Sequence, residues 1–297
     1  MTRQLVFVHG RAQENKDAAH LKAGWIEAWS RGLAKSGLQV PIAESDIRFP
    51  YYGQTLLGLV TSLPADEIAE VIVKGSESDA QKKEFVRKVL AEVQAKCGID
   101  DAQVAAELGS DVVQKGPLNW QFVHGILRAI DRHVPGASGP SIALATNDVY
   151  EYLKNPGVRD PIEAGVRSAI ARDSSTVVVS HSLGTVVTYN LLRREGETMG
   201  WKVPLLVTVG CPLAVTAIKQ ALRPIRALSC VRHWYNAMDK RDVVALYPLD
   251  KANFDIDPAI ENNTNVDNHT ENRHGIDGYL DDKDVARRIH DALVAPI

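Results

Sequence analysis

The sequence predicts an α/β fold, with a mostly parallel central sheet of about six strands and helices on both faces. Short uncharged runs of β-forming residues alternate with segments in which apolar residues recur every three or four positions. Polar residues directly follow several of the apolar runs. In parallel α/β sheets the functional residues lie at the carboxyl ends of the strands, which is where these polar residues would be. The chain has 297 residues, 45% apolar and 24% charged, which suits one domain over residues 1–297.

The expected strands are short and apolar on both faces, as in a buried parallel sheet. The first ends at His9 and Gly10, and the third leads into a serine-containing turn. Residues 254–270 are rich in asparagine and aspartate, and we cannot place a strand there from the pattern. The placed strands cover residues 5–8, 46–49, 176–179, 205–209 and 230–235.

Helical periodicity dominates the segments between the strands. In residues 17–35 the apolar side chains from Leu21 to Leu33 are spaced by four, on one face of a helix. Further helices are expected over residues 64–73, 81–96, 118–133, 161–172 and 282–293.

Residues 55–145 carry helical signals but none for strands. Because strands of the same sheet resume afterwards, we interpret this stretch as an all-helical insertion that forms a cap over the site. Residues 135–141 are rich in glycine and proline and are expected to be a linker near its end.

The most informative stretch is residues 176–192, a β-forming run followed by Ser-His-Ser-Leu-Gly and a helical pattern. This order predicts the nucleophile elbow of a serine hydrolase, with Ser182 on a sharp strand-to-helix turn. Strand and helix approach closely there, so small residues are needed two positions before and after the serine. Ser180 and Gly184 occupy those positions. The helix dipole would favour negative charge developing beside Ser182.

A nucleophilic serine needs a base to take its proton and an acid to orient that base, in the order serine, acid, histidine on this fold. His274 precedes the last expected helix and is the preferred base, with His269 as the alternative. Asp242 is the preferred acid, because the residues after it predict a short helix that its carboxylate would cap. Asp239 is the alternative acid.

Two backbone N–H groups should stabilise the tetrahedral intermediate of such a reaction. We expect one from Leu183, directly after the serine, and the other from Arg11, in the loop after the first strand. The expected substrate pocket is lined by His9, Gly10, His181, Tyr51 and Tyr52.

Several of these motifs together resemble the α/β-hydrolase superfamily, and within it bacterial lipase- or esterase-like enzymes. The motifs are residues 9–10, 180–184, 210–213, 236–244 and His274. Residues 236–244 are similar to the Asp-Ile-Val-Pro segment of class 3 lipases, which favours Asp242 as the acid.

The chain departs from that family in two ways: Ser180 stands where a glycine is usual, and two N-terminal strands of larger members have no counterpart. The resemblance implies hydrolysis of a small-molecule ester or acyl substrate through an acyl-serine intermediate, without a cofactor. A catalytically silent fold that binds a ligand or partner, and an acyltransferase or amidase with the same three residues, are the alternatives.

Composition argues against several other functions. A net charge of -3 gives no basic patch for nucleic acid, and no stretch is apolar enough for a transmembrane segment. The acidic and histidine residues between 267 and 274 lack the spacing of a zinc motif, so no metal is expected.

Three widely spaced cysteines, and a first strand that begins at residue 4, favour a cytoplasmic protein without a signal peptide. The pattern does not determine the oligomeric state.

Overall fold

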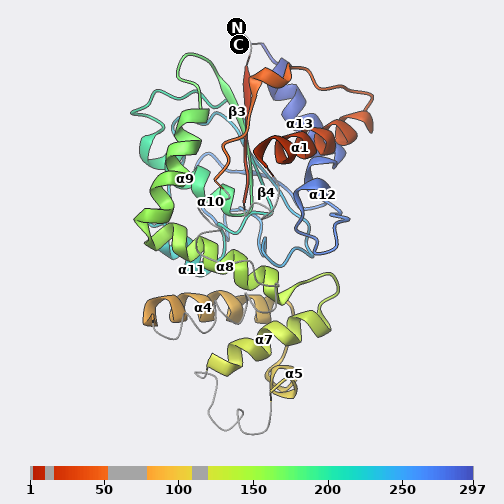
Figure 1. Cartoon of the computed structure of the whole chain (residues 1–297), viewed down its shortest axis with the longest axis vertical. Coiled ribbons are helices and arrows are strands. Elements are labelled where there is room, and N and C mark those ends of the chain that lie inside the picture. Colours follow the sequence, from red (N-terminus) through yellow and green to blue (C-terminus); the bar gives the residue numbers. More distant parts are fainter. Residues whose placement is uncertain (1–2, 11–16, 53–78, 109–119, 297) are drawn as a thin grey trace.

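The structure is a computed structural model that describes residues 3–10, 17–52, 79–108 and 120–296 (Figure 1). The amino ends of the strands point toward the end of the molecule where both termini lie (Figure 1). Their carboxyl ends point the other way, toward a group of helices from the middle of the chain.

Six parallel strands form the central sheet in the order β2-β1-β3-β4-β5-β6. The chain passes from β1 to β2 on one side and later to β3 on the other, so the direction of winding reverses at β1. In such sheets a crevice opens at the carboxyl ends beside the reversal. The strands are β1 (Gln4–Val8), β2 (Ile47–Arg48), β3 (Thr176–His181), β4 (Leu206–Val209), β5 (Trp234–Ala237) and β6 (Glu261–Asn263).

Helices cover both faces of the sheet, as the sequence predicted. Side chains alternate along β1, so Leu5 and Phe7 enter one apolar core while Val6 and Val8 enter the other. Helices α1, α12 and α13 lie on the first face, and α8 to α11 lie on the second (Figure 1). Their bounds are α1 (Ala18–Ala34), α8 (Gly139–Lys154), α9 (Pro156–Ala169), α10 (Leu183–Glu195), α11 (Thr216–Ala221), α12 (Ile276–Leu280) and α13 (Lys283–Val294).

In the described part of the chain, α4 (Ala80–Lys96), α5 (Asp101–Ala106) and α7 (Trp120–His133) lie together beyond the carboxyl ends of the strands (Figure 1). We call these three helices the helical lobe. Within the chain, α4 contacts α8 and α11, and α7 contacts α8. The lobe therefore shares one continuous core with the second face of the sheet. The helix expected at 64–73 lies outside the described residues.

Three local predictions were wrong. The expected linker at 135–141 overlaps α8, a helix the sequence analysis missed: Ser138 caps it and Pro140 lies in its first turn, where a missing N–H is tolerated. The strand expected at 230–235 begins only at Trp234. Before it, Val231 makes just an isolated bridge to Val203, and continuous pairing starts later. The residues after Asp242 form bends, not the expected helix.

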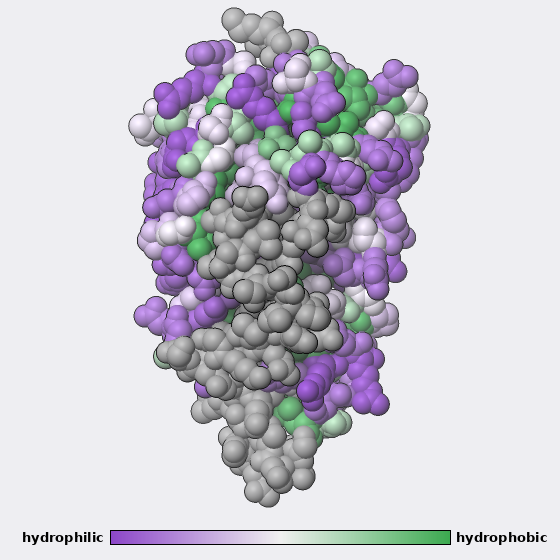
Figure 2. All heavy atoms as spheres, in the orientation of Figure 1, coloured by the Kyte–Doolittle hydropathy of each residue, from purple (hydrophilic) through white to green (hydrophobic). Residues whose placement is uncertain are grey.

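The surface of the described part is mostly hydrophilic on the face shown in Figure 2. Val294 is its one exposed large hydrophobic residue. No helix among the described residues combines the length and apolar character needed to cross a bilayer.

Gly184 allows α10 to begin directly against β1. A Cβ at this position would lie 2.3 Å from the carbonyl oxygen of Val8 and 2.6 Å from that of His9. These are backbone atoms of β1 and of the residue after it, and they cannot move aside cheaply, so the contact requires glycine.

We expect Gly184→Ala to lower the free energy of unfolding by about 3 kcal/mol, because an added methyl group must push β1 and α10 apart. The control is Gly165→Ala in α9, where the nearest atom to an added Cβ is 3.8 Å away. That change should stabilise the protein by about 0.5–1 kcal/mol through helix propensity. Urea unfolding measures both, and equal effects would contradict the packing argument.

Candidate active site

Ser182 forms a sharp turn between β3, which ends at His181, and α10, which begins at Leu183. It has φ 53° and ψ −127°, a conformation that non-glycine residues rarely adopt outside functional sites. Its N–H donates to the Val209 carbonyl at 3.2 Å, and its carbonyl accepts from the N–H and hydroxyl of Thr185. The predicted strand–turn–helix arrangement is confirmed.

Hydrogen bonds link Ser182 to His274 and His274 to Asp242. The Oγ of Ser182 lies 2.9 Å from Nε2 of His274, whose Nδ1 lies 2.7 Å from Oδ2 of Asp242. An ionised carboxylate only accepts, so Nδ1 carries a hydrogen and donates it to Asp242. In the neutral ring, Nε2 is then the acceptor for the hydroxyl proton of Ser182. This arrangement can remove that proton, which activates a serine as a nucleophile.

The carboxylate of Asp242 is buried, with the residue 2% exposed, and is surrounded by donors. Oδ2 also accepts from the Tyr279 hydroxyl at 2.6 Å, and Oδ1 accepts from the N–H groups of Val244 at 2.8 Å and Ala245 at 3.3 Å. Burial raises the pKa of Asp242, but the charge of protonated His274 and these hydrogen bonds outweigh it and lower the pKa overall. Asp242 is therefore held in its ionised form.

Asp239, the alternative acid, holds the loop that carries His274. Its Oδ2 accepts from the N–H of Asn268 at 2.8 Å, and its Oδ1 accepts from the N–H of Arg241 at 2.8 Å. Buried Asn268 in turn donates from Nδ2 to the carbonyl of Gly275 at 2.8 Å, one residue beyond the histidine. Asp239 thus fixes the position of His274 without contacting its ring.

His269, the alternative base, lies away from Ser182. Its side chain is 59% exposed, and its Nε2 is 3.6 Å from a carboxylate oxygen of Asp281. Of the two candidate pairs, the structure brings Asp242 and His274 to Ser182.

His181 and Gly210 fix the ring of His274 from one side. The two histidine ring centroids are 4.7 Å apart, and Nε2–H of His181 donates to the carbonyl of His274 at 2.8 Å. Burial and then the charge of His274 lower the pKa of His181 to about 3, so it stays neutral. Gly210 has φ 55°, and a Cβ there would lie 3.0 Å from Cε1 of His274. Glycine at this position leaves room for both rings.

His9 supports the loop after β1. Its Nδ1–H donates to the carbonyl of Gly10 at 2.7 Å, and its Nε2 accepts from the N–H of Tyr52 at 3.2 Å. The Tyr52 ring stacks on it at 3.9 Å between centroids, and the Tyr52 hydroxyl donates to the His9 carbonyl. Burial lowers the pKa of His9 to about 4. A Cβ on Gly10 would lie 2.8 Å from Cβ of Ser182, so this loop contacts the turn directly.

Leu183 supplies the first N–H of α10, and the first N–H groups of a helix have no acceptor within the helix. This donor is next to Ser182, where it can bind an oxygen that becomes negatively charged. Arg11, the second expected donor, lies outside the described residues, directly after Gly10.

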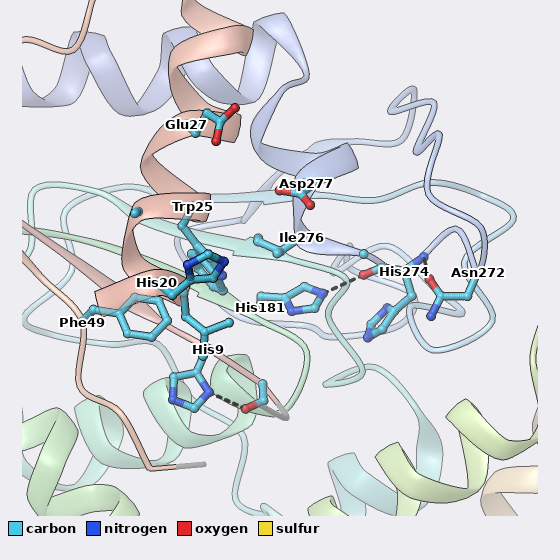
Figure 3. A pocket seen from close by; sticks show the side chains of 15 residues that line it. His9, His20, Trp25, Glu27, Phe49, His181, Asn272, His274, Ile276 and Asp277 are labelled. Atoms are coloured by element: carbon cyan, nitrogen blue, oxygen red, sulfur yellow. Dashed lines mark hydrogen bonds between the residues drawn. The ribbon is translucent and has the colours of Figure 1, made fainter. Parts of the chain in front are cut away.

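Two cavities lie beside these groups. The smaller, of about 20 Å³, lies under α4 and α8, and Ser182 and Thr146 are the polar residues among its described lining. The larger, of about 340 Å³, lies between α1 and α12 (Figure 3). His9, Gly10 and His181, three residues of the expected substrate pocket, line it together with His274. Tyr51 and Tyr52 are not in the described lining of either cavity.

Tyr279 and Asn268 were missed by the sequence analysis. Tyr279 follows the histidine loop in α12 and donates to Asp242. A buried tyrosine hydroxyl needs a hydrogen-bond partner, so a tyrosine five residues after His274 was a signal that the sequence offered. Asn268 lies in the asparagine-rich region that could not be interpreted. Helix α8 was also missed, and its buried Thr146 lines the smaller cavity beside Ser182.

The described part of the chain also contains side chains of the metal-binding types and cysteine thiols. No three His, Cys, Asp or Glu side chains within it converge as metal ligands would. Cys97, Cys211 and Cys230 are free thiols, and burial raises the pKa of each.

Comparisons with protein-family models, with curated proteins and with solved structures found no match to this chain. The functional argument therefore rests on the geometry of the site. The resemblance to the α/β-hydrolase superfamily stays a prediction.

The low pKa of His9 predicts that the free energy of unfolding decreases as the pH falls. The unfolded residue titrates near 6.5 and the folded one near 4, so between pH 6.5 and 4 the unfolded chain takes up a proton that the folded chain does not. Stability from this group is complete above pH 6.5 and is lost as pH falls toward 4. Relative to His9→Gln, the wild type should lose about 2 kcal/mol of unfolding free energy between pH 6.5 and 5.

Urea unfolding at several pH values measures this difference. Between pH 7 and 8 the two proteins should show the same pH dependence, which serves as the internal control. Parallel curves across the whole range would show that His9 is not held neutral by burial.

Proposed function

We propose that this chain is a serine hydrolase that cleaves carboxylic esters through an acyl-serine intermediate. The nucleophile is Ser182, the general base is His274, and the acid that orients the base is Asp242. The observation that carries this proposal is the hydrogen-bond chain through the three side chains, at 2.9 Å and 2.7 Å, starting from a serine with φ 53°. No cofactor is needed for this chemistry.

In the proposed reaction, Oγ of Ser182 attacks the ester carbonyl carbon while its proton moves to Nε2 of His274. The imidazolium that forms lies against the ionised carboxylate of Asp242, which stabilises the positive charge. The carbonyl oxygen becomes negative and accepts a hydrogen bond from the N–H of Leu183. His274 then returns the proton to the leaving alcohol, and water attacks the acyl-serine by the same steps in reverse.

The arrangement of the chain supports an α/β-hydrolase fold for this enzyme. The serine follows β3, the acid follows β5 and the histidine follows β6, which is the chain order of that superfamily. We propose that residues 55–145 form its helical cap, supported by the helical lobe, whose α4 covers the small cavity at Ser182. Helix α8 crosses position 145 and joins the lobe to the sheet. Three free thiols support a reducing, cytoplasmic location.

Labelling with a fluorophosphonate probe tests the nucleophile. The wild type should be labelled and should turn over p-nitrophenyl acetate, whereas Ser182→Ala should lose both activities. The matched control is Ser180→Ala, a buried serine two residues earlier whose hydroxyl donates to the Val207 carbonyl at 3.3 Å. It should retain labelling. Equal labelling of wild type and Ser182→Ala would rule out the assignment, and no labelling of the wild type would favour a catalytically silent fold.

The two aspartates give a second test. Asp242→Asn should reduce kcat roughly 10³–10⁴-fold, because an amide can donate to Nδ1 and favours the wrong imidazole tautomer. Asp239→Asn should keep kcat within about tenfold and instead lower the unfolding free energy by about 1–3 kcal/mol, because it weakens the bond to Asn268. Steady-state kinetics and urea unfolding separate these effects. Reversed outcomes would make Asp239 the functional acid.

A further inference from the structure

The two cavities meet the reacting groups from different sides. Ser182 lies in the wall of the smaller cavity, and His274 lies in the wall of the larger one. In the proposed reaction the acyl group stays bonded to the serine oxygen, whereas the leaving alcohol must accept a proton from Nε2 of the histidine. The smaller cavity is therefore placed for the acyl group and the larger one for the alcohol.

The size of the smaller cavity limits what can enter it. Its free volume of about 20 Å³ is little more than the ~10–15 Å³ that one water needs. Its wall is built from buried apolar side chains, including Val89 and Val93 of α4 and Ile142 and Val149 of α8. A short apolar acyl chain fits this space without displacing core residues.

The larger cavity is much roomier, at about 340 Å³, and its wall mixes polar and apolar side chains. Its polar lining, labelled in Figure 3, includes His20 and Glu27 of α1, Asp277 of α12 and Asn272 of the histidine loop. Trp25 adds an apolar wall, and its ring lies edge-on to His181. Arg31 contacts the carboxylates of Glu27 and Asp277 at 3.3 Å and 3.8 Å, which partly neutralises that rim. Such a lining suits an uncharged ligand ring that bears hydroxyl groups better than it suits a charged ligand.

Gly24 gives an independent reason to read this cavity as a binding site. It lies within the 17-residue helix α1, where glycine is less favourable than alanine. No described atom lies within 4 Å of a Cβ placed there, and its φ is not in the left-handed region. Neither packing nor backbone conformation calls for glycine, in contrast to Gly184. What Gly24 provides is open space in the cavity wall.

We propose that the larger cavity binds the leaving alcohol of the substrate and that Gly24 sets its size. The preferred substrate is then an ester of a short acyl chain with a bulky, hydroxyl-bearing alcohol. This inference rests on the proposed ester hydrolysis and adds the orientation of the substrate to it.

Two acetate esters of primary alcohols test the alcohol side, with acetate release as the measurement. Because the larger cavity has room for a sugar ring, the wild type should favour 6-O-acetylglucose over ethyl acetate by about tenfold or more in kcat/KM. Gly24→Leu fills the cavity and should remove this preference, with ethyl acetate changed less than about twofold. The control is Ala34→Leu, at the exposed far end of α1, which should behave as wild type.

Ethyl acetate and ethyl hexanoate test the acyl side. The wild type should strongly favour acetate, and Val93→Ala should raise kcat/KM for the hexanoate about tenfold relative to the acetate. The control is Val86→Ala, the same change at a buried position of α4 that does not line the cavity. It should leave the ratio unchanged.

The outcomes separate this inference from the proposed function. If Gly24→Leu impairs ethyl hexanoate and spares 6-O-acetylglucose, the larger cavity holds the acyl group and the orientation is reversed. If Gly24→Leu changes neither preference while ethyl acetate is still hydrolysed, the cavity is not part of the substrate site. Both results overturn the inference and leave ester hydrolysis standing. Absence of turnover and of fluorophosphonate labelling in the wild type would overturn both.

Discussion

The close approach of α10 to β1 is the contact on which the site depends. With no side chain at Gly184, the helix begins against the carbonyl groups of Val8 and His9, and one residue must then make the whole turn from β3. That residue is Ser182, which is why it has a positive φ. Two other loops also come close because they carry glycine: Gly10 packs against Ser182, and Gly210 packs against the ring of His274. The strain at Ser182 is thus imposed by the packing of a central strand and helix.

The electrostatics of the site follow from burial and from the number of donors each group finds. Asp242 stays ionised in a buried position because three N–H groups and a tyrosine hydroxyl hydrogen-bond to it. His9 and His181 find only backbone partners, and burial keeps both neutral. The carboxylate therefore faces His274 without a competing positive charge from either neighbouring ring.

The sequence could predict the parts of the fold that depend on local pattern. The β3 run, the turn at Ser182 and the helix α10 were readable because apolar runs, small residues and periodicity all agreed. Asp242 was chosen for a helix that does not form, yet its carboxylate accepts the N–H bonds of a cap within a bend. Helix α8 was missed because Gly139 and Pro140 resemble a linker, and Ser138 as its cap was not recognised. Tyr279 and Asn268 bond to aspartates in distant segments, so no local pattern could name their partners.

The two sides of the site differ in how freely they can change. Val89 and Val93 belong to the core that joins the helical lobe to the sheet and also line the cavity at Ser182, so altering that cavity disturbs the packing of α4. The wall formed by α1 at Gly24 touches no described neighbour within 4 Å of a new Cβ and can gain side chains without displacing any. In the proposed enzyme, the acyl preference is therefore tied to the stability of the fold, whereas the alcohol preference is not. Selection for a different alcohol could act on α1 alone, and selection for a longer acyl chain would have to rebuild the contact between the lobe and the sheet.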